Sequence, residues 1–186
     1  MILFNAKIYD YKEKDFTIKD IEIKDGKIIS IKEPSLEENN FPIDEITQLV
    51  HVKNNKQRIN LKGLLVLPGG IDPHVHFDTP GFTSREDFFH GSSSSAAGGI
   101  TTVIDMPCTS IPPVTSKEYF IYKRDFLEKE SVVDYAFFGG VNGNTFGNVE
   151  KNFSDLKKMG VKGIKVYLIS GMKTFERLDS YQLMMV

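Results

Sequence analysis

Apolar and polar residues alternate along the first third of the chain, as they do in half-buried β-strands. The pattern predicts a strand over residues 2–9 and two more within residues 16–31, on either side of the pair Asp25-Gly26. An Asp-Gly pair between alternating segments is a strong hairpin signal, because primed turns need positive φ at both central residues. A further strand is predicted over residues 58–67.

The pattern of apolar and polar residues changes after residue 67. Nearly continuous apolar segments now alternate with amphipathic ones, which is typical of a parallel sheet with intervening helices. Strands are predicted over residues 70–77, 100–107, 132–141 and 163–169, and helices over 84–99, 116–130 and 150–160. Four strands in this order suit either a doubly wound sheet or part of a (β/α)8 barrel.

The two patterns divide the chain into residues 1–66 and residues 67–186. Within the first part, residues 33–57 are rich in Asn, Glu and Lys and indicate a polar surface excursion. A complete (β/α)8 barrel takes about 250 residues, roughly twice the length of the second part. If the second part is a barrel, we therefore expect about its first four β/α units, from a truncated polypeptide.

Composition excludes several classes of function. The chain is 40% hydrophobic and 26% charged with a net charge of -2, which fits a soluble globular protein and disfavours a nucleic-acid binder. A single Cys excludes a disulfide framework and a cysteine zinc cluster. No signal peptide and no run of about 18 apolar residues is visible, so we expect a cytoplasmic protein with no membrane partner.

The strongest chemical signal is the pair His74 and His76, in the sequence DPHVH. Residues two apart in a strand share a face, with Cα atoms about 6.6–7 Å apart. Both imidazoles can then enter one space at the carboxyl end of the strand, where barrel active sites lie. Neutral imidazoles suit zinc and other first-row metals. Ordinary surface or core histidines are the alternative, although the flanking glycine-rich turns favour a metal site.

Lys165 lies inside an apolar predicted strand, where a charge faces a desolvation cost. By residue type alone, the favoured interpretation is a lysine that extends to solvent at the strand end. A buried lysine can instead be a nucleophile. Its reaction with carbon dioxide would give a carbamate, an anion with two oxygens that can bridge two cations.

Four blocks of sequence resemble the cyclic amidohydrolases, in the branch of dihydroorotases, allantoinases and hydantoinases. The blocks are PGGIDPHVHF, AAGGITTVIDMP, VDYAFFGGV and GVKGIKVYLIS, all within residues 58–176. The resemblance implies a (β/α)8 barrel and a small β-sandwich lobe that residues 1–66 share with strands after the barrel. It also implies a site with two divalent metals, expected to be zinc, in which His74 and His76 bind the first ion and carbamylated Lys165 bridges the two. Hydroxide generated by the metals would attack a ring amide.

The chain also departs from that family. The family adds two histidines from later strands and a late aspartate that is both ligand and proton shuttle, but this chain has four histidines and none follows Lys165. No catalytic residue is therefore assigned within the 186 residues. We expect this polypeptide alone to be inactive and the full-length protein to be a homo-oligomer.

Three residues bear on the substrate, which we expect to be a small cyclic amide or ureide. Asp78 replaces the Arg with which dihydroorotases hold a substrate carboxylate, and Cys108 replaces their usual Asn. Ser170 stands where hydantoinases have a Tyr. The loop DMPCTSIPPVT resembles that of allantoinases. An allantoinase-like enzyme is favoured, with a dihydroorotase or a hydantoinase as alternatives.

Two hypotheses from other classes stay open. One is a non-catalytic, dihydropyrimidinase-like scaffold protein, which the joint presence of the two histidines and Lys165 disfavours. The other is a doubly wound binding module, which gives no reason for the histidine pair. Asp72 and Asp105 are candidates to orient a ligand imidazole or to play a structural role. We expect neither His51 nor His90 to bind metal.

Overall fold

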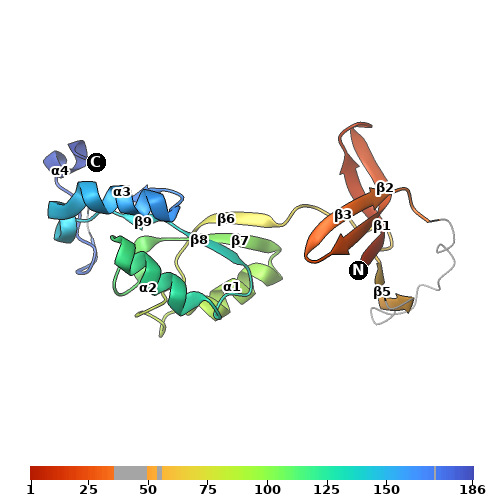
Figure 1. The fold of residues 1–186 in the computed structure, drawn as a ribbon, viewed down its shortest axis with the longest axis horizontal. Helices are drawn as coiled ribbons and strands as arrows, with labels where there is room; N and C mark the ends of the chain where they lie inside the picture. The colour runs from red at the N-terminus through yellow and green to blue at the C-terminus, as the bar shows by residue number, and fades with distance from the viewer. Residues whose placement is uncertain (36–49, 54–55, 170) are drawn as a thin grey trace. The chain divides into compact units, whose positions relative to one another are not determined.

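The computed structural model describes residues 1–35, 50–53, 56–169 and 171–186. Contacts within the chain divide it into two compact units, Met1–Pro68 and Gly69–Val186. The described part of the first unit is a sheet, and the second combines sheet and helices, so the chain is a mixed α/β protein (Figure 1). No described helix has the length and apolar character needed to cross a membrane.

The first unit contains one five-stranded sheet. Its strands are β1 (Ile2–Asp10), β2 (Asp15–Lys24), β3 (Lys27–Lys32), β4 (Val50–Lys53) and β5 (Lys56–Asn60). They are arranged in the order β3-β2-β1-β5-β4, with β1 and β5 parallel and the other pairs antiparallel. The predicted hairpin is confirmed, because β2 and β3 pair across Asp25 and Gly26, which have φ values of 50° and 71°.

Two predictions for this unit are wrong in part. The strand predicted over residues 58–67 ends at Asn60, because Asn60 Oδ1 accepts the N–H of Lys62 and the chain turns there with positive φ at Lys62 and Gly63. The polar excursion predicted over residues 33–57 includes β4 and the start of β5, which pair with each other. Residues 36–49 and 54–55 of that segment lie outside the described residues.

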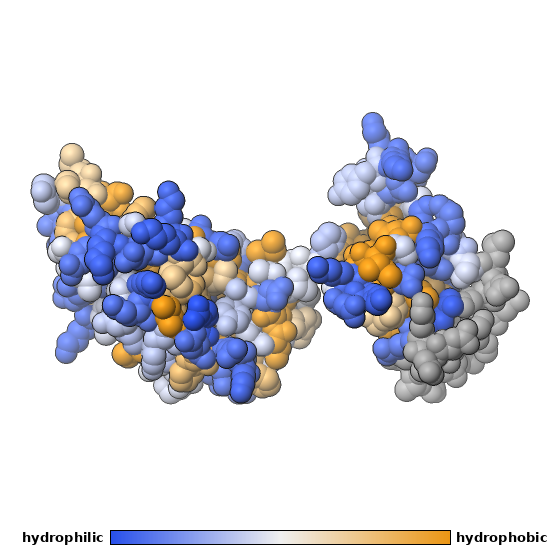
Figure 2. Space-filling model, viewed as in Figure 1, coloured by the Kyte–Doolittle hydropathy of each residue, from blue (hydrophilic) through white to orange (hydrophobic). Residues whose placement is uncertain are grey.

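Large hydrophobic side chains are exposed on the sheet of the first unit (Figure 2). Ile28, Ile29 and Ile31 in β3 are each more than half exposed, and Phe16 and Ile18 in β2 are also exposed. Large exposed apolar side chains gathered on one element are typical of an interaction site.

The second unit alternates strands and helices. Its strands are β6 (Gly70–Val75), β7 (Ile100–Asp105), β8 (Asp134–Phe137), β9 (Gly139–Gly140) and β10 (Ile164–Lys165). Its helices are α1 (Phe88–Ala97), α2 (Lys117–Leu127), α3 (Val149–Met159) and α4 (Ser180–Met184), with short 3-10 helices η3 (Pro107–Thr109) and η4 (Gly143–Asn148). β6, β7 and β8 pair in parallel in that order, and β9 pairs in parallel with β10.

The predicted elements of this unit are present but mostly shorter. α1 begins at Phe88 rather than residue 84, because the side chain of Asp87 caps the helix by accepting the N–H of His90 at 2.8 Å. α3 ends at Gly160, whose φ of 83° is the left-handed conformation typical of a helix end. β10 comprises two residues of the seven predicted, and β6 ends before His76.

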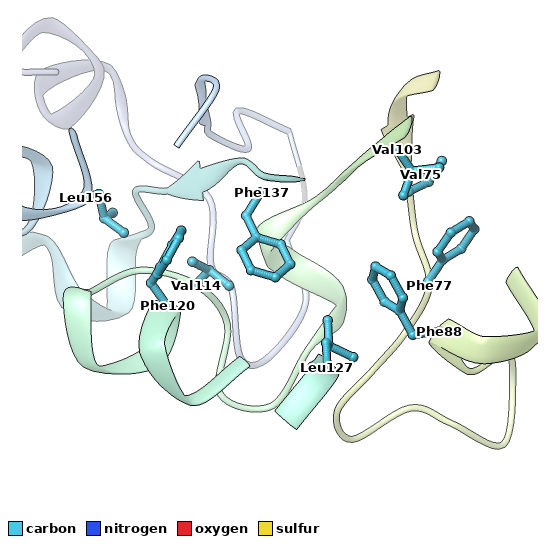
Figure 3. Packing of buried hydrophobic residues seen from close by; sticks show 9 residues of the cluster. All are labelled: Val75, Phe77, Phe88, Val103, Val114, Phe120, Leu127, Phe137 and Leu156. Atoms are coloured by element: carbon cyan, nitrogen blue, oxygen red, sulfur yellow. The ribbon is translucent and has the colours of Figure 1, made fainter. Parts of the chain in front are cut away.

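The main hydrophobic core lies between the parallel strands and the helices α1, α2 and α3 (Figure 3). Its buried members are Val75, Phe77, Phe88, Val103, Val114, Phe120, Leu127, Phe137 and Leu156. Phe77 and Phe88 pack edge to face, and so do Phe120 and Phe137. This core fixes the strands whose carboxyl ends carry the candidate site.

Candidate metal centre

His74 and His76 meet at the carboxyl end of β6. His74 is in the strand and His76 immediately follows it, and their Nε2 atoms lie 3.3 Å apart. The His74 ring is exposed, whereas His76 is half-buried. The spacing of two residues therefore directs both imidazoles into one space, as the sequence predicts.

Lys165 reaches the same space from the end of β10. Its Nζ lies 3.4 Å from Nε2 of His76, although 89 residues separate the two in sequence. The residue is half-buried, and none of the described carboxylates forms an ion pair with it. The predicted convergence of the three side chains is confirmed, whereas metal binding by them stays a prediction.

The second ring nitrogen of His76 has its own partner. Nδ1 lies 3.1 Å from the hydroxyl Oγ1 of Thr109, in η3. Burial, and next the positive charge of Lys165, lower the pKa of His76 below its ordinary value. The imidazole is therefore neutral near pH 7, which is the form that binds a metal.

Cys108 and Tyr167 form a pair beside His76. The Tyr167 hydroxyl donates a hydrogen bond to Sγ of Cys108 at 3.1 Å, and that sulfur lies 4.0 Å from Nδ1 of His76. Burial, and then the contact with Cys108, raise the pKa of Tyr167 to about 12, so the phenol remains a donor. Lys165 Nζ lies 5.3 Å from the centre of the Tyr167 ring, a cation–π distance. Cys108 is fully buried and packs with Met106 and Phe175.

The three aspartates that the sequence singles out, Asp72, Asp78 and Asp105, make their hydrogen bonds and ion pairs with groups other than the two imidazoles. Asp72 Oδ1 accepts the backbone N–H of His74 at 3.0 Å. Asp105 is fully buried, accepts the N–H of Phe77 and forms an ion pair with Lys123. Asp78 is 3% exposed, its Oδ2 lies 3.1 Å from Nε of Arg85, and its buried Oδ1 has no hydrogen-bond partner.

Sequence reasoning did not find Thr109, Tyr167 or Arg85. Tyr167 could have been found, because it is two residues from Lys165 and so falls on the same face of the strand predicted over residues 163–169. Thr109 lies in the short 3-10 helix η3 and Arg85 in a turn, where periodicity gives no direction. Ser170, a predicted substrate residue, lies outside the described residues. His90 is away from the pair and bonds to Asp87.

The geometry of the histidine pair fits a metal ion. Two nitrogens bound tetrahedrally to one zinc at about 2.0–2.1 Å are about 3.3–3.4 Å apart, and the two Nε2 atoms are 3.3 Å apart. Among the described residues, no group of three or more His, Cys, Asp and Glu side chains could hold a metal. Lys165, whose Nζ lies 3.4 Å from Nε2 of His76, is a candidate for a third ligand of another type.

Comparison with known proteins identifies the family. Residues 65–170, more than half of the chain, match the model of the amidohydrolase family. The chain belongs to the amidohydrolase family. The matched segment contains the two histidines and Lys165, so the amidohydrolase signature and the convergent side chains coincide in this chain.

Curated relatives of this amidohydrolase carry more than one name. It is 44% identical over 119 residues to a dihydroorotase of Methanosarcina mazei, covering 64% of this chain and 25% of the relative. It is 39% identical over 129 residues to an allantoinase of Rubrobacter xylanophilus, covering 69% of this chain and 28% of the relative. The chain thus spans about a quarter of the length of these curated relatives.

Solved structures similar to this chain include hydantoinases. An L-hydantoinase (dihydropyrimidinase) from Arthrobacter aurescens matches with a TM-score of 0.76 and 26% identity, over 98% of this chain and 36% of that one. A D-hydantoinase matches with a TM-score of 0.64 and 27% identity, over 95% of this chain and 35% of that one. The predicted membership of the dihydroorotase, allantoinase and hydantoinase branch is confirmed at the level of the family.

Proposed function

We propose that the protein is a metal-dependent cyclic amidohydrolase, which hydrolyses a ring C–N bond of a small cyclic amide or ureide. The observation that carries this proposal is the approach of Lys165 to His74 and His76. Three nitrogen-bearing side chains, from the carboxyl ends of β6 and β10, meet in one space, although these strands lie far apart in sequence and pair in separate parallel sheets. A non-catalytic scaffold would not need this convergence.

We further propose that Gly69–Val186 is part of a (β/α)8 barrel. The strand order supports this, because β6, β7 and β8 are neighbours in sequence order and β10 pairs with β9, which follows β8 after one residue. In the two common doubly wound orders, the first strand has neighbours on both sides within the first four strands. Here β6 pairs only with β7 among the described strands.

For Met1–Pro68 we propose one half of a β-sandwich lobe. Its exposed isoleucines in β3 supply an apolar surface that a second sheet would bury. The strands of the second sheet would come from a part of the protein beyond these 186 residues.

His74 and His76 would hold the first metal through Nε2, with Thr109 at Nδ1 fixing the ring of His76. The ammonium of Lys165 would lose one proton, and addition of carbon dioxide with loss of a second proton would give a carbamate, whose oxygens would help to hold the metals. The change replaces a positive charge beside two imidazoles with a negative one. Divalent metals at such a site, zinc in this proposal, supply Lewis-acid activation of water for attack on an amide carbon.

For the substrate we propose an allantoinase-like preference. Asp78 stands where dihydroorotases have the Arg that holds a substrate carboxylate, and its own carboxylate is buried and lies beside Arg85, so it would not hold such a substrate. Cys108, buried beside His76, and Ser170 complete the residues that we assign to the substrate side. The second candidate is a dihydroorotase, which the 44% identity to a relative of that name favours.

A kinetic comparison tests both candidates. A full-length protein containing this chain is assayed for ring opening of allantoin, dihydroorotate and hydantoin, after loading with zinc and bicarbonate. We expect the highest kcat/KM for allantoin and almost no activity in the His76→Ala variant. A clear preference for dihydroorotate would overturn the role of Asp78, and zinc-free protein with full activity would overturn the proposed function.

A further inference from the structure

A fully buried ion pair lies next to the strand end that carries the histidines. Asp105, the last residue of β7, and Lys123, in α2, are both 0% exposed, and Lys123 Nζ donates to Asp105 Oδ2. The same Nζ lies 5.4 Å from the centre of the Phe137 ring. Lys and Asp are almost never fully buried unless paired. Apolar residues of similar size often replace such a pair without loss of stability, so stability alone gives little reason for it.

The second oxygen of Asp105 holds the backbone beside His76. Oδ1 accepts the N–H of Phe77 at 2.9 Å, in a buried hydrogen bond. Val75 is the last residue of β6 that pairs with β7, and its carbonyl accepts the N–H of Met106. Beyond Val75, the N–H of Phe77 therefore bonds to the side-chain carboxylate of Asp105, where a regular parallel ladder would use a backbone carbonyl of β7.

The hydrogen bond from Phe77 to Asp105 fixes the backbone on which the His76 side chain is mounted. The residue lies between Val75, which β7 holds through the ladder, and Phe77, which Asp105 holds through its carboxylate. The residues on both sides of His76 are therefore hydrogen-bonded to the carboxyl end of β7. Lys123 in turn fixes the carboxylate, because its ammonium occupies the other oxygen.

We propose that Asp105 is a positioning residue for His76, and that its hydrogen bond to the N–H of Phe77 sustains the metal affinity of the histidine pair. The inference rests on the proposed function, since it concerns the same metal site. It differs from a purely structural role, in which the pair would only attach α2 to β7. A structural role predicts that metal affinity follows stability, whereas a positioning role separates the two.

Two double variants of the full chain separate these roles. Asp105→Asn with Lys123→Met removes both charges but keeps an oxygen for the N–H of Phe77. Asp105→Leu with Lys123→Met removes the charges and that oxygen, at nearly the same side-chain volume. Each is titrated with Co²⁺ against a chelator, and its urea midpoint is measured without metal. We expect the Asn variant to bind Co²⁺ within about threefold of the parent, and the Leu variant about 10–100-fold more weakly.

A backbone change provides a measurement that does not disturb the buried pair. Replacement of Phe77 by phenyllactic acid turns its N–H into an ester oxygen, which removes the donor to Asp105 Oδ1 and keeps every side chain. We expect Co²⁺ binding at least tenfold weaker than in the parent, even if the Leu variant fails to fold. Unchanged Co²⁺ affinity of the ester, or equal affinities of the two double variants, would overturn the positioning role alone. A parent chain that binds no Co²⁺ would overturn the proposed metal site and this inference together.

Discussion

Thr109→Val changes one hydroxyl to a methyl group behind the proposed ligand His76. Thr109 is 5% exposed and its Oγ1 lies 3.1 Å from Nδ1 of His76, so the variant leaves this ring nitrogen without that partner. Groups that hold a ligating histidine in this way typically contribute about 10–100-fold to metal affinity. That corresponds to about 1.4–2.8 kcal/mol of binding free energy. We expect a loss of this size for Co²⁺ or Zn²⁺.

The assay is a titration of the chain with Co²⁺ in competition with a chelator, alongside urea unfolding of the metal-free protein. Thr109→Ser is the matched control, because it keeps the hydroxyl and should bind Co²⁺ nearly as tightly as the parent. A Thr109→Val variant with unchanged Co²⁺ affinity and an unchanged urea midpoint would refute the role given to Thr109.

Three further predictions concern stability, pH and turnover. Leu156→Ala empties a fully buried core position, so we expect urea unfolding to show a loss of about 2–5 kcal/mol; a loss under about 1 kcal/mol would contradict this. Because the pKa of His76 is below its ordinary value of 6.5, the unfolded chain takes up the proton first, and stability should fall as pH drops through 6.5. His76→Gln should weaken this dependence in urea titrations at several pH values, and an unchanged dependence would refute the assignment. The 186-residue polypeptide should not open allantoin with added zinc, and measured turnover would contradict the need for further ligands.

The sequence predicts the site better than the ends of the elements around it. The two-residue spacing of His74 and His76 sets their direction through the strand period alone, so it could be derived without tertiary contacts. Lys165 could be placed at a strand end, but residue type favoured a solvent-exposed lysine. Only the resemblance to amidohydrolases assigned it to the histidines, and the 3.4 Å distance to His76 agrees with that assignment.

The remaining features depend on contacts between distant residues. β6 ends at Val75 because Asp105, far along the chain, takes the N–H of Phe77, which no local pattern reveals. The strands β4 and β5 pair within a stretch whose polar composition predicted an excursion. Lys123 lies on a helix predicted as amphipathic, in which a lysine is expected on the solvent side, yet its ammonium is buried against Asp105. Charge compensation across elements thus overrides the preference that composition suggests.

The central claim is that His74, His76 and Lys165 form one metal site. The most direct test is a crystal structure of the chain grown with Zn²⁺ and bicarbonate, with anomalous data at the zinc edge. We predict an anomalous peak about 2.0–2.1 Å from Nε2 of both histidines, with density for a carboxylate on Nζ of Lys165. A zinc peak elsewhere in the molecule, with the histidine pair free of metal, would contradict the account.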